Sequence, residues 1–160
     1  SGIPYGTAFV KNGYVGRTFI KPKQSSRESS VRVKLNVLRE AVEGKRVIMI
    51  DDSIVRGTTS DRIVHMLREA GAKEVHMRVS SPPFLWPCYF GTDVPAREQL
   101  IAYNRTVEEI RQVIGADSLG YLDCSRLRQM AGDLPICTGC FTGNYPLDPP
   151  MEDIRGEFEQ

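Results

Sequence analysis

Two adjacent carboxylates, followed by a glycine and three hydroxyl residues, are the side chains of this sequence best suited to chemistry. Asp51 and Asp52 directly follow the apolar run 47–50, and Gly-Thr-Thr-Ser occupies positions 57–60. Ionised carboxylates only accept hydrogen bonds, so such a pair suits the vicinal hydroxyls of a sugar or a hydrated Mg²⁺. Backbone N–H groups at a helix start favour a phosphate. The segment predicts a site for a phosphorylated sugar, although an ordinary turn with a helix cap uses the same residue types.

The elements around this segment would place it at one edge of a parallel sheet. We expect a fully buried strand at 46–50, a helix at about 58–70 and a second strand at 74–80. The helix is indicated by Ile63, Val64 and Leu67, which share one face. Short connections between strand, helix and strand favour parallel pairing. In open α/β sheets, ligands bind beyond the carboxyl ends of the strands, where the acidic pair stands.

Outside residues 46–80, the sequence indicates helices and strands less strongly. Strand-like pieces fall at 7–10 and 14–20, and apolar residues at helical spacing predict a helix over 31–43. Further helices are expected at 96–103, at 107–114 after a capping box from Thr106 to Glu109, and at 125–131. A short strand is expected at 119–122. About three strands in all are few for a doubly wound fold, so the sheet is expected to be partial.

Composition excludes several classes of function. The 160 residues carry 21 Lys and Arg against 20 Asp and Glu, a net charge of +1, which gives no broad field for nucleic acid or an anionic membrane. The apolar runs are too short to span a bilayer, and the first residues lack a signal-peptide pattern. A cytoplasmic protein acting on a small molecule is expected.

The whole of segment 47–60 resembles the phosphoribosyl-pyrophosphate (PRPP) motif of type I phosphoribosyltransferases. The run Asp-Asp-Ser-Ile-Val-Arg-Gly-Thr-Thr is similar, more narrowly, to that of the glutamine PRPP amidotransferases. The resemblance implies that Asp51 and Asp52 contact the ribose hydroxyls and face Mg²⁺, and that the following loop holds the 5-phosphate. The substrate-binding residues it implies are Asp51, Asp52, Ser53, Val55, Arg56, Gly57, Thr58 and Thr59.

The polar segment 14–34 is rich in Arg, Lys and Ser, which is also typical of a solvated surface loop. Its residue sequence resembles that of the flexible catalytic loop of the same family. In that family, this loop folds over PRPP. The resemblance implies that Arg32 and Lys34, and then Arg17 and Tyr14, support the charge on the departing pyrophosphate.

Four cysteines stand at 88, 124, 137 and 140. The Cys137-Thr-Gly-Cys140 pair leaves zinc, an iron–sulfur cluster and thiol redox chemistry open, and Cys124 is expected to be a small buried apolar residue. The segment 137–146 resembles the C-terminal signature of amidotransferases that carry a [4Fe–4S] cluster. The resemblance implies Cys88, Cys137 and Cys140 as ligands, with a fourth outside this chain, so that the cluster is expected to be absent or incomplete here.

Together these features predict an α/β protein: a partial, doubly wound parallel sheet of the type I phosphoribosyltransferase fold, with a helical, cysteine-containing C-terminal extension. The expected segments are 1–86, 87–146 and a disordered tail at 147–160. The resemblance implies a part of an enzyme that makes 5-phosphoribosylamine from PRPP and glutamine-derived ammonia, in the first step of purine synthesis. It further implies inhibition by purine nucleotides, a homo-oligomer when intact, and a glutaminase domain absent here. The upstream part of the transferase domain, which grips pyrophosphate, is also expected to be missing, so the chain alone should be inactive or nearly so. A non-catalytic sensor of PRPP or purine nucleotides is the alternative.

Overall fold

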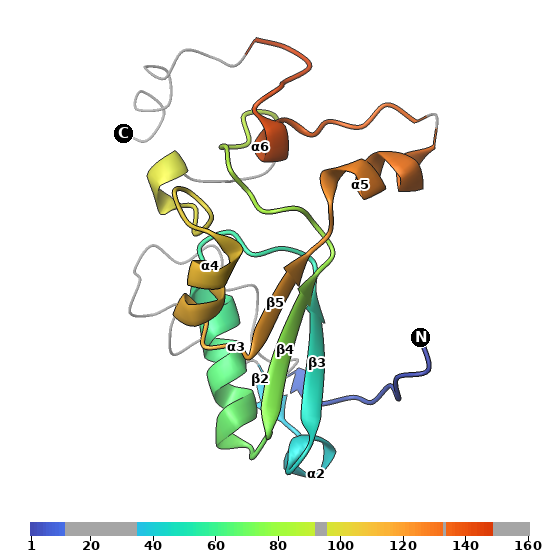
Figure 1. Cartoon of the computed structure of the whole chain (residues 1–160), viewed down its shortest axis with the longest axis vertical. Coiled ribbons are helices and arrows are strands. Elements are labelled where there is room, and N and C mark those ends of the chain that lie inside the picture. Colours follow the sequence, from blue (N-terminus) through green and yellow to red (C-terminus); the bar gives the residue numbers. More distant parts are fainter. Residues whose placement is uncertain (12–34, 92–95, 133, 149–160) are drawn as a thin grey trace. The chain divides into compact units, whose positions relative to one another are not determined.

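A computed structural model describes residues 1–11, 35–91, 96–132 and 134–148 of the chain. Its larger sheet has three strands in the order β3 (Arg46–Asp51), β4 (Glu74–Val79) and β5 (Ser118–Tyr121). The three arrows run in the same direction in Figure 1, so the sheet is parallel, as predicted. Strands β3 and β4 and the intervening helix α3 (Thr58–Glu69) match the predicted strand-helix-strand unit within two residues.

Contacts within the chain group it into two compact units that interleave along the sequence. The first unit comprises Ser1–Met49, Gly57–Met77 and Arg111–Leu119, and the second comprises Ile50–Arg56, Arg78–Ile110 and Gly120–Gln160. The segment boundaries expected from the sequence stay a prediction. Among the described residues, no helix is long and apolar enough to cross a membrane, and the expected cytoplasmic location also stays a prediction.

The core of the first unit forms from one face of α3 and one face of β4. Ile63, Val64 and Leu67 of α3 are buried, as their spacing predicts, and Val75 and Met77 are both fully buried. Alternate residues of a strand point to opposite faces, so Glu74 and His76 lie on the other side of β4. A further tie is Asp117, whose carboxylate accepts hydrogen bonds from the Val75 N–H (2.6 Å) and from Arg68 (2.9 Å).

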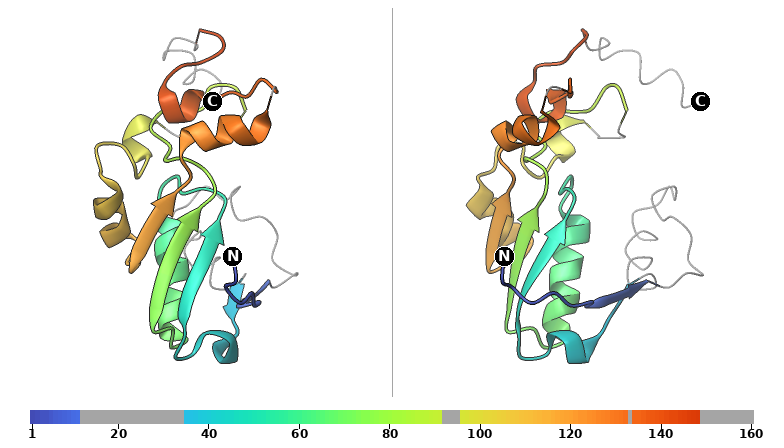
Figure 2. Two further views of the ribbon diagram at one scale, coloured as in Figure 1. Left: turned by 45° about the vertical axis from the view of Figure 1, so that its right-hand side comes forward. Right: turned by 90° about the vertical axis from the view of Figure 1, so that its right-hand side faces the viewer.

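The helix predicted over 31–43 is wrong where the structure describes it. Leu35–Val37 is strand β2, which pairs antiparallel with β1 (Phe9–Lys11), and only Arg39–Val42 forms helix α2. The partner strand explains the difference. The ladder from β1 satisfies the backbone groups that a helix would have paired internally, and it continues as the Leu38 N–H donates to the Ala8 oxygen. Figure 2 shows this small ribbon apart from the arrows of the larger sheet.

The expectation of a fully buried β3 is also wrong. Its burial alternates along the strand, with Ile48 43% and Ile50 75% exposed. The sheet order places β3 at an edge, and within the described residues one of its faces has no covering layer. A continuous apolar run is typical of a strand with other elements packed on both faces. The run alone does not show whether such elements are present.

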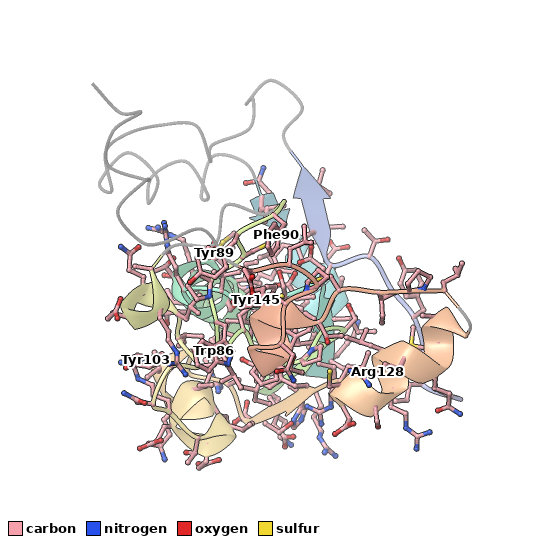
Figure 3. All side chains as sticks on the ribbon, turned by 90° about the horizontal axis from the view of Figure 1, so that it is seen from above. Trp86, Tyr89, Phe90, Tyr103, Arg128 and Tyr145 are labelled. Carbon is pink, nitrogen blue, oxygen red and sulfur yellow. The ribbon has the colours of Figure 1, made fainter. Side chains whose placement is uncertain are left out.

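The second unit packs around Phe84 and Leu100, with Val55, Cys88, Tyr103, Cys140 and Phe141 against them. An aromatic group lies beside this cluster: the ring of Tyr145 is 5.1 Å from Tyr89 and 6.0 Å from Phe90, in edge-to-face arrangements (Figure 3).

Of the helices predicted in the C-terminal half, some form and one does not. The capping box begins α4 (Val107–Val113): Thr106 and Glu109 exchange the hydrogen bonds expected of that motif. α5 (Cys124–Ala131) is capped by Asp123, and α6 is Gly139–Thr142. The helix predicted at 96–103 is wrong, since only the 3₁₀ turn η2 (Arg97–Gln99) forms there.

Candidate ligand site at the end of strand β3

The acidic pair stands where β3 ends, and neighbouring backbone fixes its first member. The main-chain oxygen of Asp51 accepts hydrogen bonds from the N–H (2.9 Å) and the hydroxyl (3.1 Å) of Ser80, the residue that follows β4. The Asp51 backbone is thereby held while its carboxylate stays half-buried and that of Asp52 is exposed. Sequence reasoning missed Ser80, although its place directly after the neighbouring parallel strand could have indicated it.

Each carboxylate is oriented by the next residue along the chain. The Asp52 N–H donates to Oδ1 of Asp51 (3.0 Å), and the Ser53 N–H donates to Oδ1 of Asp52 (2.8 Å). Burial, and then the negative charge of Asp52, raise the pKa of the Asp51 carboxyl above its ordinary value, although the bond from the Asp52 N–H opposes this. Sugar hydroxyls or a divalent cation at this site would favour the ionised form of Asp51.

The loop after the pair is anchored to the interior of the second unit. Ile54 is only 2% exposed, and the oxygen of Val55 accepts a hydrogen bond from the Ile101 N–H (2.8 Å). Arg56, in contrast, is exposed. Ile101 is held in place because it belongs to the buried run 100–102. No motif in the sequence indicated that Ile101 supports this site.

Gly57 opens helix α3 in a conformation that favours glycine. Its φ is 81°, in the left-handed region, and its oxygen accepts the helical hydrogen bond from the Asp61 N–H (2.9 Å). Thr58 and Thr59 in the first turn are exposed. The first N–H groups of a helix have no partner inside it, so they and the two hydroxyls are available to an anion. The assignment of this turn as a phosphate loop stays a prediction.

Tyr14, Arg17, Arg32 and Lys34 lie outside the described residues. Their proposed role in catalysis stays a prediction.

The cysteines of the second unit occupy two different environments. Cys88 and Cys140 are half-buried against the Phe84–Leu100 cluster, whereas Cys137 is exposed. The oxygen of Cys140 accepts hydrogen bonds from the N–H groups of Leu85 and Trp86. Burial, followed by the nearby Cys88 thiol, raises the pKa of Cys140 to about 11. Cys124, expected to be buried, is half-buried.

Among the described residues, no three His, Cys, Asp or Glu side chains are grouped so that they could hold one metal ion by themselves. In the metal-free protein, the raised pKa of Cys140 favours its protonated thiol.

A parallel α/β sheet with an acidic pair at a strand end, followed by a glycine that opens a helix, defines the chain as a phosphoribosyltransferase-type protein. Its sequence is 56% identical over 159 residues to the amidophosphoribosyltransferase of Archaeoglobus fulgidus, an alignment covering 97% of this chain and 35% of that protein. The chain belongs to the amidophosphoribosyltransferase family. It spans about a third of the length of the curated relatives it matches.

Solved structures agree with this assignment. A structure described as the allosteric regulatory enzyme of purine biosynthesis matches with a TM-score of 0.79 and 54% identity, over 95% of this chain and 34% of that one. The glutamine PRPP amidotransferase of Bacillus subtilis, complexed with ADP and GMP, matches with the same TM-score and identity over 94% of this chain and 34% of that one. No protein-family model matches the chain.

Proposed function

We propose that the chain is the PRPP-binding part of an amidophosphoribosyltransferase, which makes 5-phosphoribosylamine and pyrophosphate from PRPP and ammonia derived from glutamine. The observation that carries the proposal is the continuous segment from Asp51 to Thr59, in which two oriented carboxylates are followed by a glycine-opened helix start. Membership of the family supports the reaction type, and the B. subtilis structure with ADP and GMP supports purine nucleotides as further ligands of the intact protein.

In the proposed reaction, the nitrogen lone pair of ammonia forms a bond to C1 of the ribose while the bond from C1 to the pyrophosphate oxygen breaks. The pyrophosphate leaves with the electron pair, and the new ammonium group loses a proton to solvent. Asp51 and Asp52 accept hydrogen bonds from the ribose hydroxyls, and they would also hold a Mg²⁺ ion, which would offset part of the negative charge of PRPP. Thr58 and Thr59 hold the 5-phosphate, which fixes the position of C1.

The remaining parts of the reaction are assigned to residues outside the described ranges or outside the chain. Arg32 and Lys34, with Arg17 and Tyr14, support the charge that develops on pyrophosphate. A glutaminase domain outside this chain is proposed to release the ammonia, and the intact protein is proposed to be a homo-oligomer. We therefore expect the 160-residue chain to bind PRPP but to release no pyrophosphate.

No step of this proposal passes through an iron–sulfur cluster. A [4Fe–4S] cluster on Cys88, Cys137 and Cys140 would need a further ligand from outside the chain. Iron and sulfide analysis of anaerobically purified protein tests for it, and a colourless, iron-free intact protein would rule it out.

Calorimetric titration of the chain with PRPP and Mg²⁺ tests the binding proposal. Asp51→Asn and Asp52→Asn should each weaken binding roughly tenfold, because each removes a charged acceptor for ribose hydroxyls. Asp148→Asn is the matched control, since Asp148 is an exposed aspartate far along the sequence from the motif. No binding by the wild-type chain, or equal binding by all four proteins, would refute the assignment of this site. Binding by the intact protein without pyrophosphate release would instead favour the sensor.

A further inference from the structure

A second candidate site lies in the first unit, at the opposite end of β3 from the acidic pair. A cavity of about 610 Å³ opens there. The start of β3, the end of α2 and the N-terminal segment line it. Helix α2 and the start of β3 lie at the foot of the sheet in Figure 1. Its volume is in the range of pockets that hold small organic molecules.

The polar part of this cavity is cationic. Lys45, Arg46, Lys73 and His76 line it, and none of its lining residues is acidic. The Glu74 carboxylate accepts a hydrogen bond from Nε of Arg46 (2.7 Å) and lies 2.9 Å from Nε2 of His76. Glu74 therefore offsets the charge of Arg46, and the residues that line the cavity keep an excess of positive charge from Lys45 and Lys73.

Two of the three cations keep donors that the fold does not use. The Lys45 ammonium donates to the oxygens of Glu40 and Ala41, at the end of α2. Within the described residues, however, the Lys73 ammonium and the terminal nitrogens of Arg46 make no hydrogen bond. The N–H donors of both groups remain available to an anion. In His76, by contrast, both ring nitrogens already have partners: Nε2 lies 2.9 Å from Glu74 and Nδ1 lies 2.9 Å from Ser118.

Backbone hydrogen bonds hold these cations together. The Lys73 N–H donates to the Lys45 oxygen (2.7 Å), and the Gly44 N–H donates to the Gly71 oxygen (2.7 Å). The two lysines thus stand on directly paired segments, an arrangement that like charges disfavour unless an anion lies between them. Gly71 has a φ of 92° and a Cβ there would lie 3.2 Å from Glu43, so the turn that positions Lys73 requires glycine.

The other wall of the cavity is apolar. Ile3, Pro4, Ala8, Val47 and Ile48 contribute to it. We propose that this cavity binds an organic phosphate monoester, whose phosphate is held by Lys73 and Arg46 and whose carbon skeleton lies against the apolar wall. The site is independent of the proposed PRPP site, which uses none of these residues.

Titration of the ¹⁵N-labelled chain with phenyl phosphate, followed by NMR, tests this proposal. Phenol and inorganic phosphate serve as comparators for the two halves of the probe. We expect saturable shifts of the Lys45, Arg46 and Lys73 amides with phenyl phosphate, weaker ones with inorganic phosphate, and none with phenol. Shifts confined to residues 57–59 would place the ligand at the phosphate loop and overturn the proposal.

Charge-removing variants complete the test. Lys73→Gln and Arg46→Gln should each weaken binding roughly tenfold, because each removes a charged hydrogen bond. Arg128→Gln, which removes a charge from the exposed side of α5 in the second unit, is the matched control and should bind as the wild type does. The Lys73 ammonium makes no hydrogen bond among the described residues, and the variant keeps the backbone bond to Lys45, so Lys73→Gln should fold normally. Equal weakening in all three variants would mean non-specific attraction and would overturn the proposal.

Discussion

The main-chain oxygen of Asp51 accepts two hydrogen bonds from a single residue, Ser80, one from its N–H and one from its hydroxyl. Asp51 ends β3, and Ser80 directly follows the neighbouring parallel strand β4. Their pairing therefore fixes the edge of the sheet at which the acidic pair stands and leaves both carboxylates free of that task.

Ser80→Ala tests the contribution of the hydroxyl. The variant keeps the N–H bond and loses the other, so we expect a decrease of about 1 kcal/mol in the free energy of unfolding, measured in urea. Ser81→Ala is the control, because the Ser81 hydroxyl is buried without a hydrogen-bond partner among the described residues. Its removal should leave stability unchanged or higher. An equal loss in both variants would contradict the role given to Ser80.

Asp117 should make the first unit sensitive to acid. The Val75 N–H, and then Arg68, lower the pKa of Asp117 below its ordinary 3.8. The unfolded chain therefore takes up this proton first, so the stabilisation is present above about pH 4 and is lost as pH falls through the lowered pKa. Asp117→Asn should cost about 1 kcal/mol at pH 7 and flatten the decline in unfolding free energy between pH 5 and 2. Asp148→Asn should keep the wild-type profile; an unchanged slope in Asp117→Asn would contradict this account.

Gly139 should tolerate no side chain. A Cβ on this residue would overlap the ring of Tyr145, with Cε1 2.6 Å away, and Tyr145 is itself held by a hydrogen bond to the Pro87 oxygen (2.7 Å). We expect Gly139→Ala to lower the free energy of unfolding by about 2 kcal/mol. Gly91→Ala is the control, since a Cβ there meets nothing within 4 Å. Comparable stability of the two variants in thermal melts would show that Tyr145 moves freely.

The cysteines should differ in reactivity. Cys137 is exposed, whereas burial and the neighbouring thiols raise the pKa of Cys140 to about 11, so almost none of it is thiolate at pH 8. Iodoacetamide labelling followed by peptide mass spectrometry should modify Cys137 first and Cys140 last. Labelling of Cys140 at the rate of Cys137 would contradict the packing described for α6.

Prediction from sequence succeeded where local chemistry decides the structure. The apolar run before Asp51, the glycine at 57 and the apolar face of α3 are local signals. The strand, the start of the helix and the helix form where they predict, although the strand is not buried on both faces. Prediction failed where distant partners decide. Leu35–Val37 is a strand because β1 pairs with it, and its helical spacing carries no information about that partner.

The segment 96–103 failed for a related reason. Its apolar residues suggested a helix, but Leu100 is fully buried and the Ile101 N–H bonds to Val55. Arg97 is held by the Leu85 oxygen (3.0 Å) and lies over the ring of Trp86. These contacts to residues far along the chain fix an irregular path, and they include the bond that anchors the loop after the acidic pair.

Trp86 is an intrinsic fluorescent probe of the second unit. It is the only tryptophan in the sequence, and it lies in the second unit, 3.4 Å from the Arg97 guanidinium and so close to Gly143 that a Cβ there would be 2.9 Å from the indole. Its fluorescence therefore reports melting of that half alone, whereas far-ultraviolet circular dichroism reports both. Two denaturation curves that coincide would show that the halves unfold as one cooperative block, and curves that separate would rank their stabilities directly.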